Sequence, residues 1–227
     1  MDHFEKELDT LKERLLTMAN RAQTAVSQAV QALLERNRDL ALQVKQSDRV
    51  IDQFEVEIDD LGIQQLVKAP LAINLRLVTA STKIAHNLER IGDEAAKIAR
   101  RAADLCQEPP IRVELDIPAM ATLTLDMLKT ALHALDHRNT ALARSVLPRD
   151  KEVDLFNRQI HGILAEFMME HPGTINRCLH WIVVSKSLER IADHATNVAE
   201  DVVYLYEGRD IRHSGAKNRP ATEIFSA

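Results

Sequence analysis

The amino-acid sequence predicts an all-α protein made of two tandem three-helix bundles, with six long antiparallel helices. Three observations lead to this prediction: few turn-forming residues, prolines spaced at helical lengths, and an internal repeat. The 227 residues include 6 Gly and 7 Pro, and only 4% are aromatic. Average usage would give roughly 16 Gly and 11 Pro. Sandwiches, barrels and propellers need a turn about every 8–12 residues, so the composition argues against them.

The prolines divide the chain into helices. Six of the seven stand at Pro70, Pro109, Pro110, Pro118, Pro148 and Pro172. A proline inside a helix costs about 3 kcal/mol or more, because it removes a hydrogen bond and clashes with the preceding turn. We therefore expect helices over residues 4–36, 38–68, 71–106, 117–140, 149–170 and 174–207, and a frayed tail over residues 209–227.

Apolar residues in these segments follow the period of packed helices. In the third segment a residue of the seam recurs every seven positions, at Leu77, Ile84, Ile91, Ile98 and Leu105, with Leu88, Ala95 and Ala102 completing it. The second segment repeats Val44, Ile51 and Ile58 in the same way. Such heptads are typical of helices packed in a bundle. Short connections predict that neighbouring helices run antiparallel.

The two halves of the chain repeat one another. LERIGDEAAKIA at 88–99 aligns with LERIADHATNVA at 188–199, and seven of the twelve positions are identical. A shift of 102 residues aligns Asp48 and Asp52 with Asp150 and Asp154. A repeat of this length indicates one structural unit present twice. We expect a first bundle over 1–106, a connection over 107–116 and a second bundle over 117–208.

Four pairs of acidic residues, each spaced i, i+4, lie within the repeat. They are Asp48 and Asp52, Glu89 and Asp93, Asp150 and Asp154, and Glu189 and Asp193. At this spacing both carboxylates of a pair share a helix face, where they repel each other. If each hairpin reverses near Pro70 or Pro172, the two pairs of a bundle lie within one helical turn of each other. Both halves therefore predict four carboxylates at one level, away from the apolar seam.

Converging carboxylates favour a bound cation, which relieves their repulsion. Oxygen ligands suit iron, manganese, magnesium or calcium, and carboxylates also hold zinc. The alternative is a set of surface ion pairs with the neighbouring Arg90 and Arg190. We expect at most an accessory role for His86 and His194. The Glu-x-x-His pattern of di-iron bundle enzymes is absent, because Gly92 and Ala192 stand three residues after the two glutamates.

Charge and hydropathy limit the possible partners and compartment. The chain has 29 basic and 34 acidic residues and a net charge of −5, which argues against a nucleic-acid surface. Its apolar runs are shorter than the roughly 18 residues of a transmembrane helix. The N-terminus lacks the pattern of a signal peptide. We therefore expect a cytoplasmic protein, peripheral to the membrane at most.

Several of these features together resemble the PhoU family of bacterial phosphate-transport regulators. They are the doubled LERIxD motif, the two Asp-x-x-x-Asp pairs, the Leu75–Arg76 segment and the sequence GRDIRH at 208–213. The resemblance implies multinuclear metal clusters of iron or zinc, or of manganese or magnesium, on the bundle surfaces. Its implied ligands are the eight acids Asp48, Asp52, Glu89, Asp93, Asp150, Asp154, Glu189 and Asp193.

The resemblance also implies a regulatory, non-enzymatic role. Family members act as negative regulators of phosphate uptake and of phosphate-starvation signal transduction, through contacts with the transporter's ATP-binding subunit and a sensor histidine kinase. We expect a homodimer. Asn74 departs from the acid usual at that position, and the second LERIGD reads LERIAD, but neither change removes a predicted ligand. Two alternatives stay open: a carboxylate-bridged metalloenzyme, and a structural helical scaffold without metal.

Overall fold

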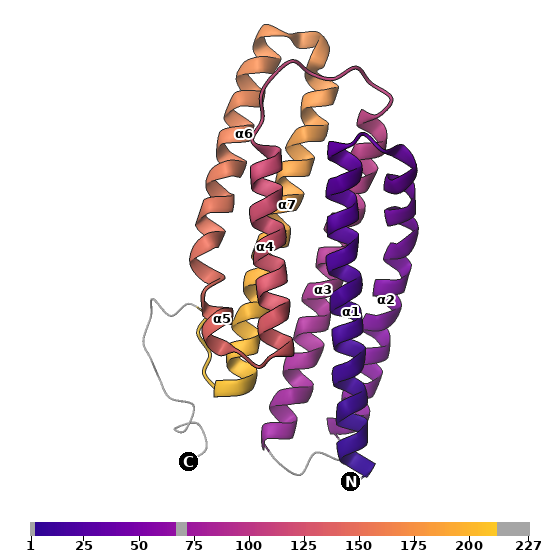
Figure 1. The fold of residues 1–227 in the computed structure, drawn as a ribbon, viewed down its shortest axis with the longest axis vertical. Coiled ribbons are helices and arrows are strands. Elements are labelled where there is room, and N and C mark those ends of the chain that lie inside the picture. Colours follow the sequence, from indigo (N-terminus) through magenta and orange to yellow (C-terminus); the bar gives the residue numbers. More distant parts are fainter. Residues whose placement is uncertain (1–2, 67–71, 213–227) are drawn as a thin grey trace.

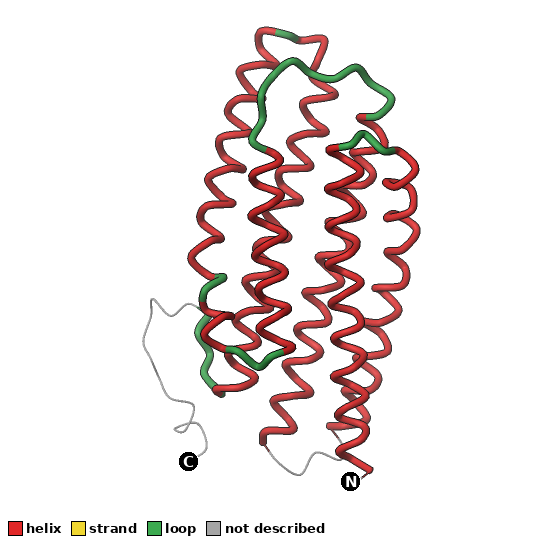
Figure 2. Tube along the Cα trace, viewed as in Figure 1, coloured by secondary structure: helices red, strands yellow, loops and turns green. Residues whose placement is uncertain are grey.

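The computed structural model describes residues 3–66 and 72–212, and in these residues it contains helices and no strand (Figures 1 and 2). The long helices are α1 (His3–Leu34), α2 (Arg38–Leu66), α3 (Ala72–Leu105), α4 (Ile117–Asp136), α6 (Asp150–Glu170) and α7 (Ile175–Glu207). This confirms the predicted all-α fold with six long helices. The expected reversal at Pro70 and most of the expected tail, residues 213–227, lie outside the described residues.

Helices α1, α2 and α3 pack against one another, and the predicted seam forms their core. Ile84, Ile91 and Ile98 of α3 are fully buried, as are the other predicted seam residues except Leu77, which is partly buried. On α2, Ile51 and Ile58 are likewise buried. The heptad spacing therefore identified the buried face of both helices.

The second unit has a short helix that the sequence did not lead us to expect. Helix α4 ends at Asp136, and a five-residue helix α5 (Thr140–Arg144) and a 3₁₀ turn (Leu147–Arg149) precede α6. Pro148 lies in that turn, and its lack of an N–H prevents a continuous helix. Gln46 occupies the equivalent place in the first unit. Helix α2 therefore runs through unbroken.

The turn after the first helix of each unit is the same. Arg36 and Arg138 both adopt a left-handed backbone, with φ of 52° and 54°. The next residue, Asn37 or Asn139, accepts a hydrogen bond from the backbone N–H three residues later, at 3.0 and 2.9 Å. An asparagine in this place caps the following helix by satisfying a free N–H group. The repeat thus extends to the details of its turns.

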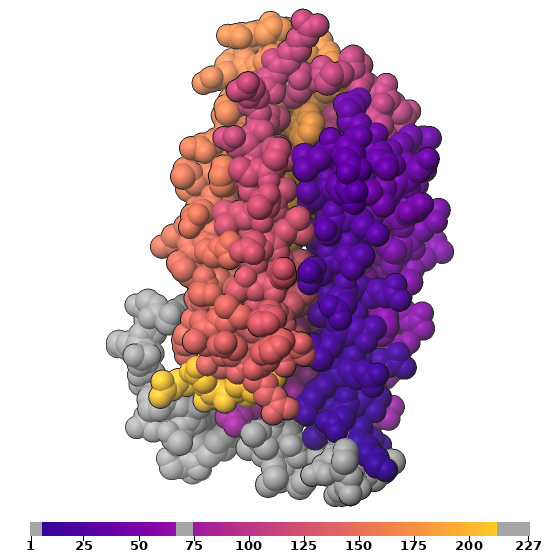
Figure 3. Space-filling model, viewed as in Figure 1, coloured from indigo at the N-terminus to yellow at the C-terminus, as the bar shows by residue number. Residues whose placement is uncertain are grey.

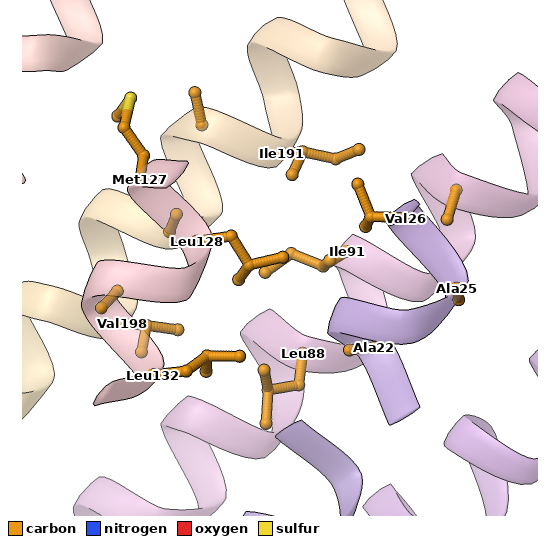
Figure 4. Close-up of a cluster of buried hydrophobic side chains, with 14 of the residues drawn as sticks. Ala22, Ala25, Val26, Leu88, Ile91, Met127, Leu128, Leu132, Ile191 and Val198 are labelled. Atoms are coloured by element: carbon orange, nitrogen blue, oxygen red, sulfur yellow. The ribbon is translucent and has the colours of Figure 1, made fainter. Parts of the chain in front are cut away.

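Helices α3 and α7 join the two units (Figure 1). They run antiparallel, because successive contacts pair later residues of α3 with earlier ones of α7: His194 Nδ1 lies 3.0 Å from Asn87 Oδ1, and Arg101 Nη1 lies 3.3 Å from His180 Nδ1. In Figure 4, Ile91 of α3 and Leu128 of α4 point toward each other. One hydrophobic core therefore spans both units.

The surface view shows α1 beside α4, with the long axes of the two units side by side (Figure 3). Helix α7 ends at Glu207 and is capped by Gly208, whose φ of 68° is left-handed and whose N–H donates to Tyr204 O at 2.9 Å. A Cβ at this position would overlap Arg76 Nη1. Two sequence segments that carry the family resemblance therefore meet in space.

Within the described residues no helix has an apolar stretch long enough to cross a membrane.

Candidate metal centre

The acids of the first unit are carried by α2 and α3, which pack against each other. Asp48 lies beside Gly92 of α3, since a Cβ at that glycine would be 3.4 Å from Asp48 Oδ1. The pKa of Asp48 is raised to about 6, mainly by partial burial and then by the charges of Asp52 and Asp93. The charges of acids from α2 and α3 therefore interact, although Asp48, Asp52 and Asp93 are not among the described residues whose ligating atoms lie within 4.8 Å of one another.

In the second unit the four acids lie near enough for their charges to interact, but among the described residues no three of them have ligating atoms within 4.8 Å of one another. The pKa of Asp193 is raised to about 6, mainly by desolvation and then by the charges of Glu189, Asp150 and Asp154. The pKa of Asp150 is raised as well, by burial and then by Asp154 and Glu189. A carboxyl that resists ionisation beside other carboxyls favours a cation in their midst.

Six of the eight acids are half-buried, and two, Asp52 and Asp193, are exposed. The side chains therefore lie at a surface and not within the core. This agrees with the heptad pattern, which placed the acids away from the apolar seam. An exposed cluster of this kind is accessible to ions and to a protein partner.

Nearby cations neutralise only part of the charge. Arg90 Nε lies 3.4 Å from Glu89 Oε2, and its Nη1 lies 3.8 Å from Asp93 Oδ2. Arg190, the other arginine proposed as a neutralising group, instead forms an ion pair with Glu94 of the first unit at 3.2 Å. Arg90 therefore pairs with the acids of its own cluster, as the ion-pair alternative expected, whereas Arg190 does not.

Glu55, which sequence reasoning did not select, and His86, for which it expected at most an accessory role, join the first cluster. One ligating atom each of Glu55, His86 and Glu89 lies within 4.8 Å of the others, the one such trio of ligating residues that the structure places together in its described portion. His86 Nδ1 is 3.0 Å from Glu55 Oε1. The signal was available: Glu55 is three residues after Asp52, and His86 is three before Glu89.

Burial and neighbouring charges also affect Glu89. Burial raises its pKa, as do Asp93 and Glu55, while Arg90 and His86 act in the opposite direction. Its Oε2 atom is buried and has an ion-pair contact with Arg90 Nε at 3.4 Å, but it accepts no hydrogen bond from the described residues. A buried carboxylate oxygen without a donor is costly. A metal ion beside it would remove that cost, so the residues present fit a metal site.

His194, the other histidine near the motifs, belongs elsewhere. Its Nδ1 contacts Asn87 between α3 and α7. Burial lowers the pKa of its imidazole. His194 therefore stabilises the interface between the units and is not part of either acidic cluster.

The fold and the paired acidic clusters define a class of helical protein with two related bundles and surface carboxylates. Comparison with known proteins identifies the family. A family model described as "PhoU domain" matches residues 15–102 and again residues 117–202. The chain belongs to the PhoU family.

Relatives match nearly the whole chain. A protein named "Phosphate-specific transport system accessory protein PhoU homolog" from Pseudomonas putida is 40% identical over 96% of this chain and 86% of its own length. A protein of the same name from Aquifex aeolicus is 37% identical over 94% of this chain and 97% of its own length. The similarity therefore includes both units.

Solved structures share the fold. The crystal structure of PhoU from Pseudomonas aeruginosa matches with a TM-score of 0.88 and 38% identity, covering 91% of this chain and 100% of that one. The phosphate transport system regulatory protein PhoU from Streptococcus pneumoniae matches with a TM-score of 0.81 and 25% identity, covering 92% and 99%. These structures support the tandem arrangement of two bundles.

Proposed function

We propose that this protein is a regulatory accessory protein of phosphate transport, which acts in the cytoplasm by contact and not by catalysis. The observation that carries the proposal is the match, over nearly the full chain, to proteins named as accessory to the phosphate-specific transport system. Its partners would be the transporter's ATP-binding subunit and a sensor histidine kinase. Through them it would restrain phosphate uptake and the phosphate-starvation response.

The metal clusters are the second part of this proposal. The eight acids Asp48, Asp52, Glu89, Asp93, Asp150, Asp154, Glu189 and Asp193 would hold divalent or trivalent ions, with iron, zinc, manganese and magnesium as candidates. Support comes from the raised pKa values of Asp48 and Asp193 and from the buried, hydrogen-bond-free Glu89 Oε2. Bound ions would supply positive charge that neutralises the clusters. The side chains would then hold a fixed arrangement on a surface that a partner can recognise.

A co-purification experiment tests the regulatory part. The affinity-tagged chain is expressed at native level in its own bacterium, and bound proteins are identified from phosphate-replete and phosphate-starved cells. We expect the transporter ATP-binding subunit and the kinase to be recovered from replete cells. Deleting the gene should raise expression of phosphate-starvation genes in replete medium.

A matched pair of variants separates the acidic surface from the fold. Asp93→Asn changes the first cluster, while Asp136→Asn removes an exposed acid at the end of α4, far from both motifs in sequence. If partner contact depends on the cluster, only the first variant should lose the partners. Recovery of neither partner under any condition, together with unchanged starvation-gene expression after deletion, would contradict the proposed role.

A further inference from the structure

The repeat allows the two clusters to be compared position by position. They differ at one pair of positions, one on the second and one on the third long helix of each unit. Helix α2 adds Glu55 and helix α3 adds His86 beyond the four acids of the first unit. With the same alignment, Asn157 and Lys186 occupy these places in the second unit. An imidazole and a carboxylate are thus replaced by a primary ammonium and an amide.

In the first unit this level offers ligands for a metal ion. Ligating atoms of Glu55, His86 and Glu89 lie within 4.8 Å of one another. Glu55 is partly buried, and the side chain of His86 is 56% exposed, so an ion can reach them from solvent. Imidazole together with carboxylates favours transition ions such as zinc, iron or manganese over magnesium and calcium.

In the second unit the same level already has a cation. Lys186 Nζ lies 2.6 Å from both carboxylate oxygens of Glu189, the residue equivalent to Glu89. Asn157 is buried, and its Oδ1 accepts a hydrogen bond from Ser185 Oγ at 2.9 Å. In the first unit Ala85 stands in place of Ser185, so Glu55 has no such hydroxyl partner and instead contacts His86. Where the second unit places a lysine ammonium bound to Glu189, the first unit therefore places an imidazole paired with a second acid.

We infer that the two centres of this chain are unequal: Glu55, His86 and Glu89 form an additional transition-metal position in the first unit, and Lys186 blocks the corresponding position in the second. This inference rests on the metal-binding part of the proposed function. It predicts one class of tight, nitrogen-ligated ion per chain. It also predicts weaker, oxygen-only binding at the remaining acids.

Metal counting on the full chain tests the inference. The purified protein is stripped with a chelator and equilibrated with buffered free Zn²⁺, and bound zinc is counted by elemental mass spectrometry. A parallel sample with Mn²⁺ is studied by pulsed electron paramagnetic resonance, which detects imidazole nitrogen bound to the ion. The unsubstituted chain should show a tight class at least tenfold stronger than the weaker class, and a nitrogen signal.

Two exchange variants give the matched comparison. Glu55→Asn combined with His86→Lys gives the first unit the side chains of the second, and it should abolish the tight class and the nitrogen signal. Lys186→His removes the tethered ammonium from the second unit and should increase the number of tightly bound ions. Circular dichroism checks that both variants are folded, as expected for changes at partly exposed positions.

The outcomes distinguish the inference from the proposal on which it rests. If the Glu55→Asn, His86→Lys variant keeps the tight class and the nitrogen signal, the inference is wrong, while metal binding by the acid pairs stands. If the unsubstituted chain binds neither Zn²⁺ nor Mn²⁺, the inference and the metal part of the proposed function both fail. Loss of the tight class in that variant alone, with binding retained in Lys186→His, supports the inference.

Discussion

Asp48 and Asp193 illustrate how single residues link the stability of this protein to pH. Each carboxyl is crowded by other acids and has its pKa raised to about 6, from an ordinary value of 3.8. A carboxyl with a raised pKa holds its proton more tightly in the folded chain than in the unfolded chain. Protonation therefore stabilises the metal-free fold, and these two groups destabilise it when they ionise.

The sign of this effect gives a testable prediction. In chelator, the contribution of Asp48 to folding should improve as the pH falls from 7 through about 6 toward 4. Asp48→Asn should make the metal-free chain more stable than the unsubstituted chain at pH 7, because the amide mimics the protonated acid. At pH 4 the two should have equal free energies of unfolding. Urea denaturation at several pH values measures this.

Asp59→Asn, an exposed change on the same helix, serves as the control. It should not reproduce the stabilisation at pH 7. In excess Zn²⁺ the order should reverse, because the ion needs the deprotonated carboxylate and protons compete with it. An Asp48→Asn variant that is no more stable than the unsubstituted chain at pH 7 in chelator would refute the assignment.

At the scale of helices, the contact between α2 and α3 explains a glycine in the middle of a long helix. A Cβ on Gly92 would lie 2.9 Å from Cδ1 of the buried Ile51. In the second unit the equivalent pair is Ala192 and Val153, both fully buried. Valine lacks the Cδ1 methyl that makes the contact too close. Each unit therefore has one methyl group at this place: Ile51 Cδ1 of α2 in the first unit, and Ala192 Cβ of α7 in the second.

This exchange predicts strong coupling between the two positions. Gly92→Ala should gain about 1 kcal/mol of helix propensity but lose about 1–3 kcal/mol through overpacking. Ile51→Val alone should cost about 0.5–1.5 kcal/mol. The double variant should be more stable than the sum of the single changes by more than about 0.5 kcal/mol. Chemical denaturation of the four proteins provides the comparison, and additive effects would show that the two side chains do not compete for this space.

Much of the helical arrangement could be predicted from sequence, because its signals are local and repeated. Heptads in α3 gave the buried face, and prolines gave most helix ends. The pairing of Glu55 with His86 in the first cluster was missed, because it depends on the register between two helices. The expected hairpin reversals placed the acid pairs only to within one helical turn of each other, whereas the structure places Asp48 beside Gly92 and near Asp93. A register known only to one turn does not identify the pairing of Glu55 with His86.

At the scale of the whole molecule, the two units pack through their equivalent helices α3 and α7, which run antiparallel. Glu94 and His194 hold equivalent places in the repeat. Hydrogen bonds from Lys97, Ser187 and Arg190 lower the pKa of Glu94 against the effect of burial, while His194 contacts Asn87. Asn87 and Ser187 are themselves equivalent positions. The units are thus fixed face to face through polar contacts as well as the shared core.

This arrangement fixes both candidate metal centres on one rigid scaffold, each between the second and third long helices of its unit. The core does not include either centre, since none of the eight candidate ligands is among its buried apolar residues. If ions bind the folded chain and not the unfolded chain, they should still raise the free energy of unfolding, by an amount that grows with the free ion concentration. The clusters can therefore change charge without a change of fold.

The most direct test of this account is a crystal structure of the full chain grown with Zn²⁺ or Mn²⁺, with anomalous diffraction used to locate the ions. The account predicts anomalous peaks between α2 and α3 beside Asp48, Glu89 and Asp93, and between α6 and α7 beside Asp150 and Asp193. A map in which both acidic clusters lack a peak, at ion concentrations that saturate binding in solution, would contradict it.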